Sequence, residues 1–87
     1  MDLILAKSKA GHDKDHHYVI IQEEGDYYIV ANGTTKTLAK PKKKKKIHLQ
    51  LIKNIPSTVL EEAKDKVLDD VLIKRILKVY NRRNDDV

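Results

Sequence analysis

The side chains most able to do chemistry in this sequence are lysines, five of which stand in a row at Lys42–Lys46. Their ammonium groups can bind phosphates, and each neutralised phosphate releases condensed counterions, so the affinity of such a site falls steeply with salt. Lysine on an exposed strand edge can also serve only to prevent aggregation. Five consecutive lysines exceed what that role requires, and the run therefore favours a site that binds an anion.

The distribution of charge points to the kind of anion. The 87 residues carry a net charge of +5, and residues 1–53 hold eleven lysines against six Asp and Glu, whereas residues 54–87 hold seven charges of each sign. This asymmetry favours nucleic acid as the partner of the first part, with an anionic membrane surface as the second choice. The balanced second part is not expected to bind RNA. The predicted RNA-binding side chains are Lys9, His12, Lys14, Lys40, Lys42, Lys43, Lys44, Lys45, Lys46 and His48.

Other kinds of site find less support. His12, His16 and His17 surround Asp13 and Asp15, which are residue types that can bind a metal. Loop histidines beside lysines are more often surface residues or phosphate donors, and the chain has no cysteine, so we predict neither a metal nor a cofactor. The serines and threonines have no accompanying histidine and acid in a catalytic arrangement. The chain is therefore predicted not to be an enzyme.

Short strands must position the basic residues. Residues 3–8 are too short and apolar for a surface helix, so we expect a strand there. Residues 18–24 and 27–32 are rich in β-branched and aromatic residues and flank Gly25-Asp26 as a hairpin. Asn32-Gly33 predicts a further turn, and residues 36–39 a short strand. The lysine run leads into an alternation of apolar and polar residues over 47–52, which is typical of a half-buried strand. Along an extended run, Lys42, Lys44 and Lys46 share one face.

The pattern changes to a helical period at Pro56. One helix is predicted to begin at a Ser57 or Thr58 cap and to carry apolar residues as far as Val67. A second begins at Asp69 or Asp70, and its apolar stripe is formed by Leu72, Ile73, Ile76, Leu77 and Tyr80. A single bent helix is the alternative. The predicted fold is mainly β with an α appendage: a small barrel of about five strands over residues 1–53, followed by a helical hairpin over residues 54–87.

The segment KSKAGHDKDHHYVII, Lys7 to Ile21, resembles the KOW motif, in which a strand ends in a basic residue, a glycine-containing loop follows and a second strand returns. With IVANGTTKTLAKPKKKKKIHLQ, the chain resembles small bacterial KOW-domain RNA-binding proteins, akin to archaeal and eukaryotic ribosomal proteins with an SH3-like barrel. The likeness covers roughly residues 3–52. The family's loop commonly reads AGRDKG, whereas His12 and Asp15 stand here in place of the arginine and the second glycine. The loss of the glycine matters less if Asp15 can adopt the left-handed backbone conformation, which Asp tolerates better than most residues.

The resulting hypothesis is a non-catalytic, monomeric protein that binds structured or ribosomal RNA through phosphate contacts, with ribosomal proteins as further partners. The alternative is an adaptor that binds a ribosomal or transcription protein through the barrel and the helical tail. Residues 3–6 are only four apolar residues in a row and follow an acidic residue, which is too short for a signal peptide. The sequence also has no stretch of about 20 apolar residues that would cross a membrane. We therefore expect a cytoplasmic protein.

Overall fold

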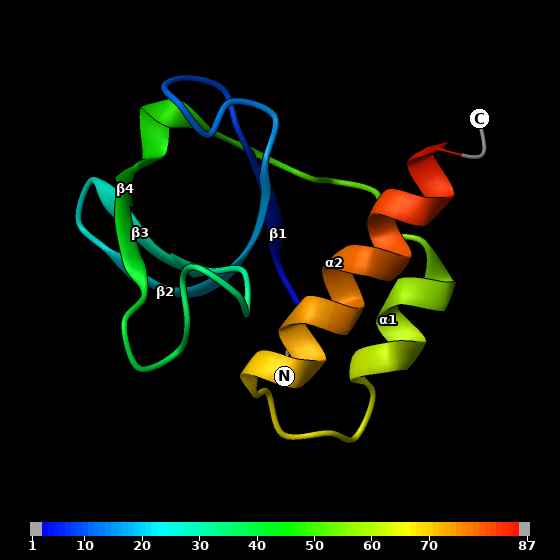
Figure 1. Cartoon of the computed structure of the whole chain (residues 1–87). Coiled ribbons are helices and arrows are strands. Elements are labelled where there is room, and N and C mark those ends of the chain that lie inside the picture. The colour runs from blue at the N-terminus through cyan, green and yellow to red at the C-terminus, as the bar shows by residue number, and fades with distance from the viewer. Residues whose placement is uncertain (1–2, 86–87) are drawn as a thin grey trace.

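The computed structural model describes residues 3–85, with the side chains of 83–85 excepted; residues 1–2 and 86–87 lie outside the described residues. Five strands are followed by two helices, which confirms the predicted mainly β fold with a helical appendage (Figure 1). The strands are β1 (Leu5–Ser8), β2 (His17–Glu24), β3 (Tyr27–Ala31), β4 (Lys42–Lys45) and β5 (Leu49–Leu51). A 3₁₀ helix, η1 (Lys46–His48), joins β4 to β5, and the helices are α1 (Ser57–Ala63) and α2 (Asp70–Asp85).

The five strands form one antiparallel sheet in the order β4-β3-β2-β1-β5. Neighbouring strands lie about 4.8 Å apart, so the edges of a flat sheet of this size would be about 19 Å apart. The three residues of η1, which join the two edge strands, span only about 6 Å. The sheet must therefore curl, and in Figure 1 its strands curve around a common centre. Within the described residues, no strand pairing joins β4 to β5, so the curled sheet is not closed by hydrogen bonds.

The turns explain which strands form. Gly25-Asp26 makes the predicted hairpin between β2 and β3, and Gly25 has φ 58°. The prediction of a strand over residues 36–39 is wrong, because local hydrogen bonds hold this segment in an irregular loop. The Asn32 side-chain oxygen accepts hydrogen bonds from the backbone N–H groups of Thr34 and Lys36, at 3.0 and 2.9 Å. The lysine run supplies the fourth strand instead.

The tail forms two helices, and Figure 1 shows them side by side and antiparallel. Asp69 caps α2, since its Oδ1 accepts the backbone N–H of Leu72 at 2.7 Å. The predicted cap of α1 is wrong: Pro56 occupies the N-cap position and no side chain bonds to the first turn. Helix α1 ends at Ala63, so Val67 lies beyond its apolar face and is 89% exposed.

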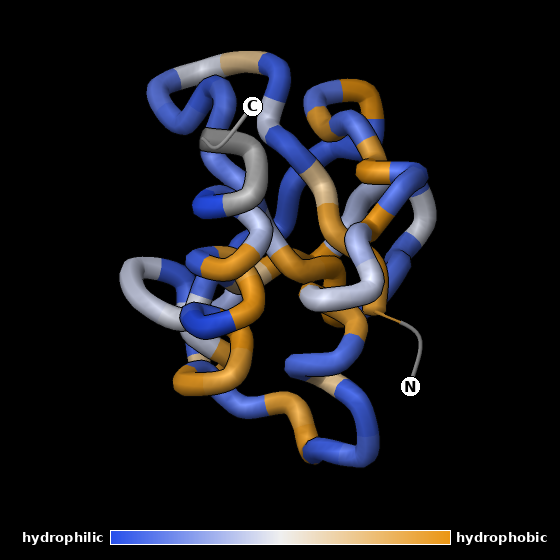
Figure 2. The backbone as a smooth tube through the Cα atoms, turned by 90° about the vertical axis from the view of Figure 1, so that its right-hand side faces the viewer, coloured by the Kyte–Doolittle hydropathy of each residue, from blue (hydrophilic) through white to orange (hydrophobic). Residues whose placement is uncertain are grey.

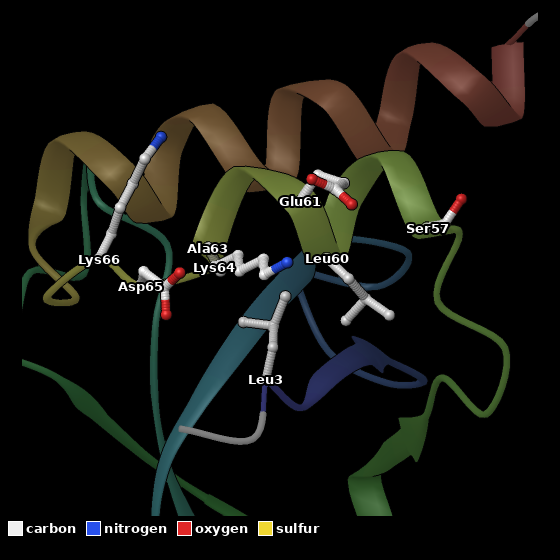
Figure 3. A pocket seen from close by; sticks show the side chains of 8 residues that line it. All are labelled: Leu3, Ser57, Leu60, Glu61, Ala63, Lys64, Asp65 and Lys66. Atoms are coloured by element: carbon white, nitrogen blue, oxygen red, sulfur yellow. The ribbon is translucent and has the colours of Figure 1, made fainter.

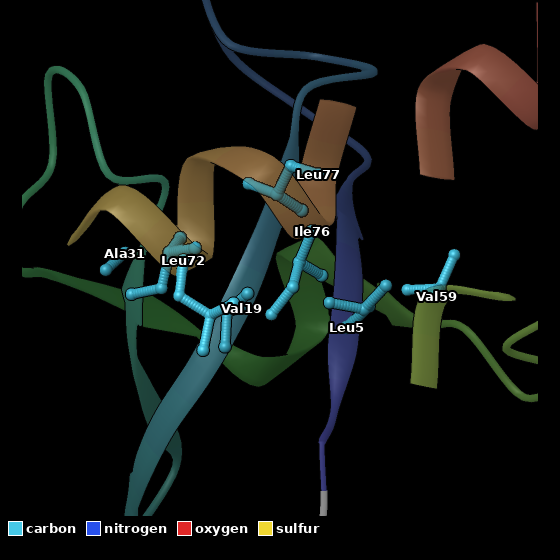
Figure 4. Packing of buried hydrophobic residues seen from close by; sticks show 8 residues of the cluster. Leu5, Val19, Ala31, Val59, Leu72, Ile76 and Leu77 are labelled. Carbon is cyan, nitrogen blue, oxygen red and sulfur yellow. The ribbon is translucent and has the colours of Figure 1, made fainter. Parts of the chain in front are cut away.

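Two apolar cores lie on opposite faces of the sheet because consecutive strand residues point in opposite directions. Leu5, Val19 and Ala31 face the helices, and their neighbours Ala6, Tyr18 and Val30 face the inside of the curl with Leu49. The predicted stripe of α2 covers the first set. Its buried members are Leu72, Ile73, Ile76 and Leu77, joined by Val59 of α1 (Figure 4). Figure 2 shows the matching alternation of hydrophobic and hydrophilic positions along the helices.

Replacing Ile76 should therefore destabilise the protein strongly. Ile76 is 0% exposed against β1 and β2, and truncating a buried isoleucine to alanine costs about 2–5 kcal/mol of unfolding free energy. Val71 lies on the same helix but is 77% exposed, so Val71→Ala should change stability by no more than about 0.5 kcal/mol. Urea denaturation of both variants measures the difference. Equal stability of the two variants would contradict this packing of α2.

Candidate nucleic-acid interface

A buried charge network lies at one end of the inner core. The Lys44 ammonium donates to Asp13 Oδ2 at 2.6 Å and to the Ser8 hydroxyl at 3.3 Å. Tyr18 Oη donates to the same carboxylate at 2.6 Å, and the Ser8 hydroxyl lies 3.2 Å from Asp13 Oδ1. The side chains of Lys44 and Asp13 are 9% and 16% exposed. The network joins β1, β2 and β4 to the β1–β2 loop.

The network stabilises the charged form of Asp13. Burial by itself would raise the pKa of this carboxyl, but hydrogen bonds from Lys44, Tyr18 and Ser8 and the charge of Lys44 hold the pKa well below its ordinary value. Burial, together with the hydrogen bond to Asp13 and its negative charge, raises the pKa of the Tyr18 hydroxyl above its usual range. Asp13 is thus ionised and Tyr18 protonated at neutral pH.

The lysine run is divided between the two faces of β4, as its alternation predicted. Lys42 and Lys44 turn toward Asp13, whereas Lys43 and Lys45 are exposed on the other face. The assignment of Lys44 as an RNA contact needs correction, because its ammonium is buried and bonded within the protein. Two other lysines of the run have acidic partners at the surface: Lys43 lies 3.2 Å from Glu24, and Lys46 pairs with Glu23.

Above the network lies an open groove formed by two loops that meet at the same end of the sheet. The β1–β2 loop spans residues 9–16 and the β3–β4 loop spans residues 32–41. We call this hollow the loop groove; it is lined by Ala10, Gly11, His12, Asp13, His16, Tyr18, Thr35, Lys36, Lys42, Lys44 and His48. The β1–β2 loop needs left-handed backbone at Gly11 and Asp15, with φ 83° and 72°. Asp15 thus has the left-handed conformation that makes the replacement of glycine acceptable at this position.

Only some of the predicted RNA-binding side chains line the loop groove. His12, Lys42 and His48 line it beside the buried Lys44. Lys9 is held close by, since its backbone N–H donates to the carbonyl of His48 at 2.8 Å, and Lys14 and Lys40 lie in the two loops. Lys43, Lys45 and Lys46 lie outside it. His16 and Lys36 also line the loop groove, although they were not in the predicted set. Their place in the two loops at the same end of the sheet was a usable signal.

Many lysines near this groove have no acidic partner among the residues that the structure describes. Among the described residues, the carboxylates Asp13, Asp15, Glu23 and Glu24 pair with lysines on strands β1 and β4 or at the start of η1. The lysines of the first part for which the structure shows no ion pair within residues 3–85 are Lys9, Lys14, Lys36, Lys40, Lys45 and Lys53. The excess positive charge therefore falls mainly on the two loops.

A second hollow, under α1, has a different character. Leu3 and Leu60 form its apolar part, and Glu61, Lys64, Asp65 and Lys66 bring charges of both signs (Figure 3). Such a mixed rim gives no preference for an anion. Within residues 3–85, no three metal-ligating side chains gather in a way that could hold an ion.

No protein-family model matches the chain, and comparison with curated protein sequences finds no significant match. The KOW resemblance thus stays a prediction from the residues quoted above. None of the helices in the described part is long and apolar enough to cross a bilayer.

Removing the ammonium of Lys44 should destabilise the fold. Lys44→Met would leave the Asp13 carboxylate, next to the inner core, with only the more distant Lys42 at 3.9 Å as an ionic partner among the described residues. Breaking a buried ion pair costs about 3 kcal/mol or more. Lys45→Met is the matched control, because Lys45 is exposed on the same strand and should cost no more than about 0.5 kcal/mol. Thermal or urea unfolding measures both. A Lys44→Met variant as stable as the control would show that the network does not support the fold.

The contribution of Asp13 should also depend on pH. Because the folded-state pKa of Asp13 is lowered from its ordinary value of 3.8, its stabilisation is complete above that value and is lost as the pH falls through the folded pKa. The stability difference between the unmodified protein and Asp13→Asn should therefore be largest at neutral pH and shrink in acid. A difference that stays constant down to the acid limit of folding would contradict the lowered pKa.

Proposed function

We propose that this chain is a non-catalytic RNA-binding protein that contacts the phosphate backbone of structured or ribosomal RNA through the loop groove. The observation that carries the proposal is the group of lysines on the two loops that have no acidic partner among the described residues, beside His12, His16 and His48. We further propose that the curled sheet is a small SH3-like barrel of the KOW type, a proposal that rests on the resemblance of residues 7–21.

The expected specificity is for the shape of the RNA. Ammonium and imidazole groups that contact phosphates position a nucleic acid without distinguishing its bases. Double-stranded RNA is recognised mostly through its backbone and groove shape. Unrelated sequences that form the same helical structure should therefore bind with similar affinity, and ribosomal proteins next to the bound RNA would add further selectivity.

The adaptor hypothesis loses one of its two grounds. The apolar stripe along α2, which was to serve as a partner surface, is buried against the sheet, whereas the resemblance to the barrels of partner-binding transcription factors is unaffected. Deleting residues 54–87 would expose Leu5, Val19 and Ala31, so a truncated chain cannot separate RNA binding from adaptor function. Charge variants of the full chain make the better test.

Neutralising the lysines of the two loops should weaken RNA binding. We expect Lys9→Gln, Lys36→Gln and Lys40→Gln, combined in one protein, to lower the affinity for a stable RNA hairpin irrespective of its sequence. The slope of log affinity against log salt should fall by about 0.7–0.9 for each phosphate that the variant no longer neutralises. Fluorescence anisotropy at several salt concentrations gives both quantities.

The matched control combines Lys53→Gln, Lys64→Gln and Lys66→Gln, which removes the same charge from exposed positions outside the loop groove. This variant should keep most of the salt slope. An equal decrease in both variants would mean that only net charge matters, and an unchanged slope in the loop variant would rule out the loop groove as the RNA contact.

A further inference from the structure

Helix α2 carries a row of cationic side chains on its exposed side. Lys74, Lys78 and Arg82 follow each other at intervals of four residues, so they lie along one face with about 6 Å between successive members. All three are exposed, and the structure shows no ion pair for them within residues 3–85. Arg75 points elsewhere: its guanidinium donates to Glu62 of α1 at 2.6 Å. Residues 54–87 thus hold equal numbers of positive and negative charges, but three of the positive charges lie together on one face of α2.

This cationic row forms one wall of another open groove, which is distinct from the loop groove and from the hollow under α1. We call it the helix groove; its lining residues are Asp15, His16, His17, Asn32, Thr34, Lys74, Leu77, Lys78, Asn81 and Arg82. The one carboxylate that the structure shows in this lining, Asp15, lies 3.4 Å from the ammonium of Lys7. Burial lowers the pKa of His17, whose ring packs edge-on against Tyr80. The remaining charge in the helix groove is therefore positive.

The helix groove and the loop groove adjoin each other. His16 lines both, and the β3–β4 loop contributes Thr34 to one and its neighbour Thr35 to the other. A chain of negative charges lying in the loop groove would reach the row on α2 by passing His16. The two grooves therefore meet at His16.

The relative position of the two grooves is fixed by close packing. Gly33 has φ 80°, and a Cβ atom placed there would overlap the carbonyl oxygen of Asp70 and lie 2.9 Å from the amide nitrogen of Lys74. Only glycine allows this approach of the loop to α2. The backbone N–H of Leu38 also donates to Asp70 Oδ1 at 2.9 Å. The β3–β4 loop is thus attached to the first turn of the helix that carries the row.

We propose that the helix groove extends the RNA-binding surface, and that the phosphate backbone runs from the loop groove past His16 along Lys74, Lys78 and Arg82. This inference rests on the proposed RNA-binding function and names the part of the tail that serves it. It replaces the expectation that the charge-balanced tail takes no part in binding.

The test compares two triple variants in the full chain. One combines Lys74→Gln, Lys78→Gln and Arg82→Gln, and the control combines Lys64→Gln, Lys66→Gln and Arg75→Gln, which removes the same residue types from the side of α1. With a stable RNA hairpin as the probe, the first variant should bind about tenfold more weakly, and its salt slope should be smaller by about 2. The control should change neither by a comparable amount. Equal binding by the two variants overturns the inference.

A titration of the unmodified protein gives a test that does not depend on the folding of any variant. Amide resonances of residues 74–82 should shift with added RNA hairpin, together with those of the β1–β2 loop, while those of residues 64–66 stay in place. Shifts confined to the two loops would overturn the role of α2 and leave the proposed function standing. Absence of any RNA binding by the unmodified protein would overturn both.

Discussion

The ion pair between Lys44 and Asp13 is the interaction on which the rest of this structure depends. Moving two charges out of water is costly, so a buried pair survives only where further hydrogen bonds complete it. Tyr18 and Ser8 provide them, and the bonds join three strands to the β1–β2 loop. Because Asp13 is anchored in this way, the backbone on either side of it holds His12 and His16 at the loop groove.

The same interaction separates the lysines by role. Asp13, Asp15, Glu23 and Glu24 pair with lysines of β1, β4 and η1. The pairs made by Asp13, Glu23 and Glu24 connect the edge strand β4 and the start of η1 to β2 and the β1–β2 loop. Lysines of the loops are left with solvent around them and with no acidic partner in the described part of the chain. Among the described residues, the cationic side chains without an ion pair thus lie mainly in the two loops and on α2, whereas most of the consecutive lysines have acidic partners.

Local patterns in the sequence were enough to predict the hairpin at Gly25-Asp26, the two helices and the apolar stripe of α2. They also predicted the alternation of the lysines along β4. The burial of Lys44 could not be predicted in this way, because its partner Asp13 lies 31 positions away. The loop of residues 32–41 is likewise positioned by Asp70, which is 32 positions from Leu38. Both grooves arise from such contacts between distant residues, which cannot be predicted from the periodicity of the sequence.

Crosslinking in living cells tests the central claim, that the loops bind the phosphate backbone of RNA, most directly. Ultraviolet light joins bound RNA to the protein; sequencing then identifies the RNA, and mass spectrometry locates the linked peptides. The account predicts recovery of structured RNA, such as ribosomal RNA, attached to peptides from residues 9–16 and 32–41. Recovery of no RNA above a mock purification, or of RNA linked only to residues 57–66 of the opposite side, would contradict it.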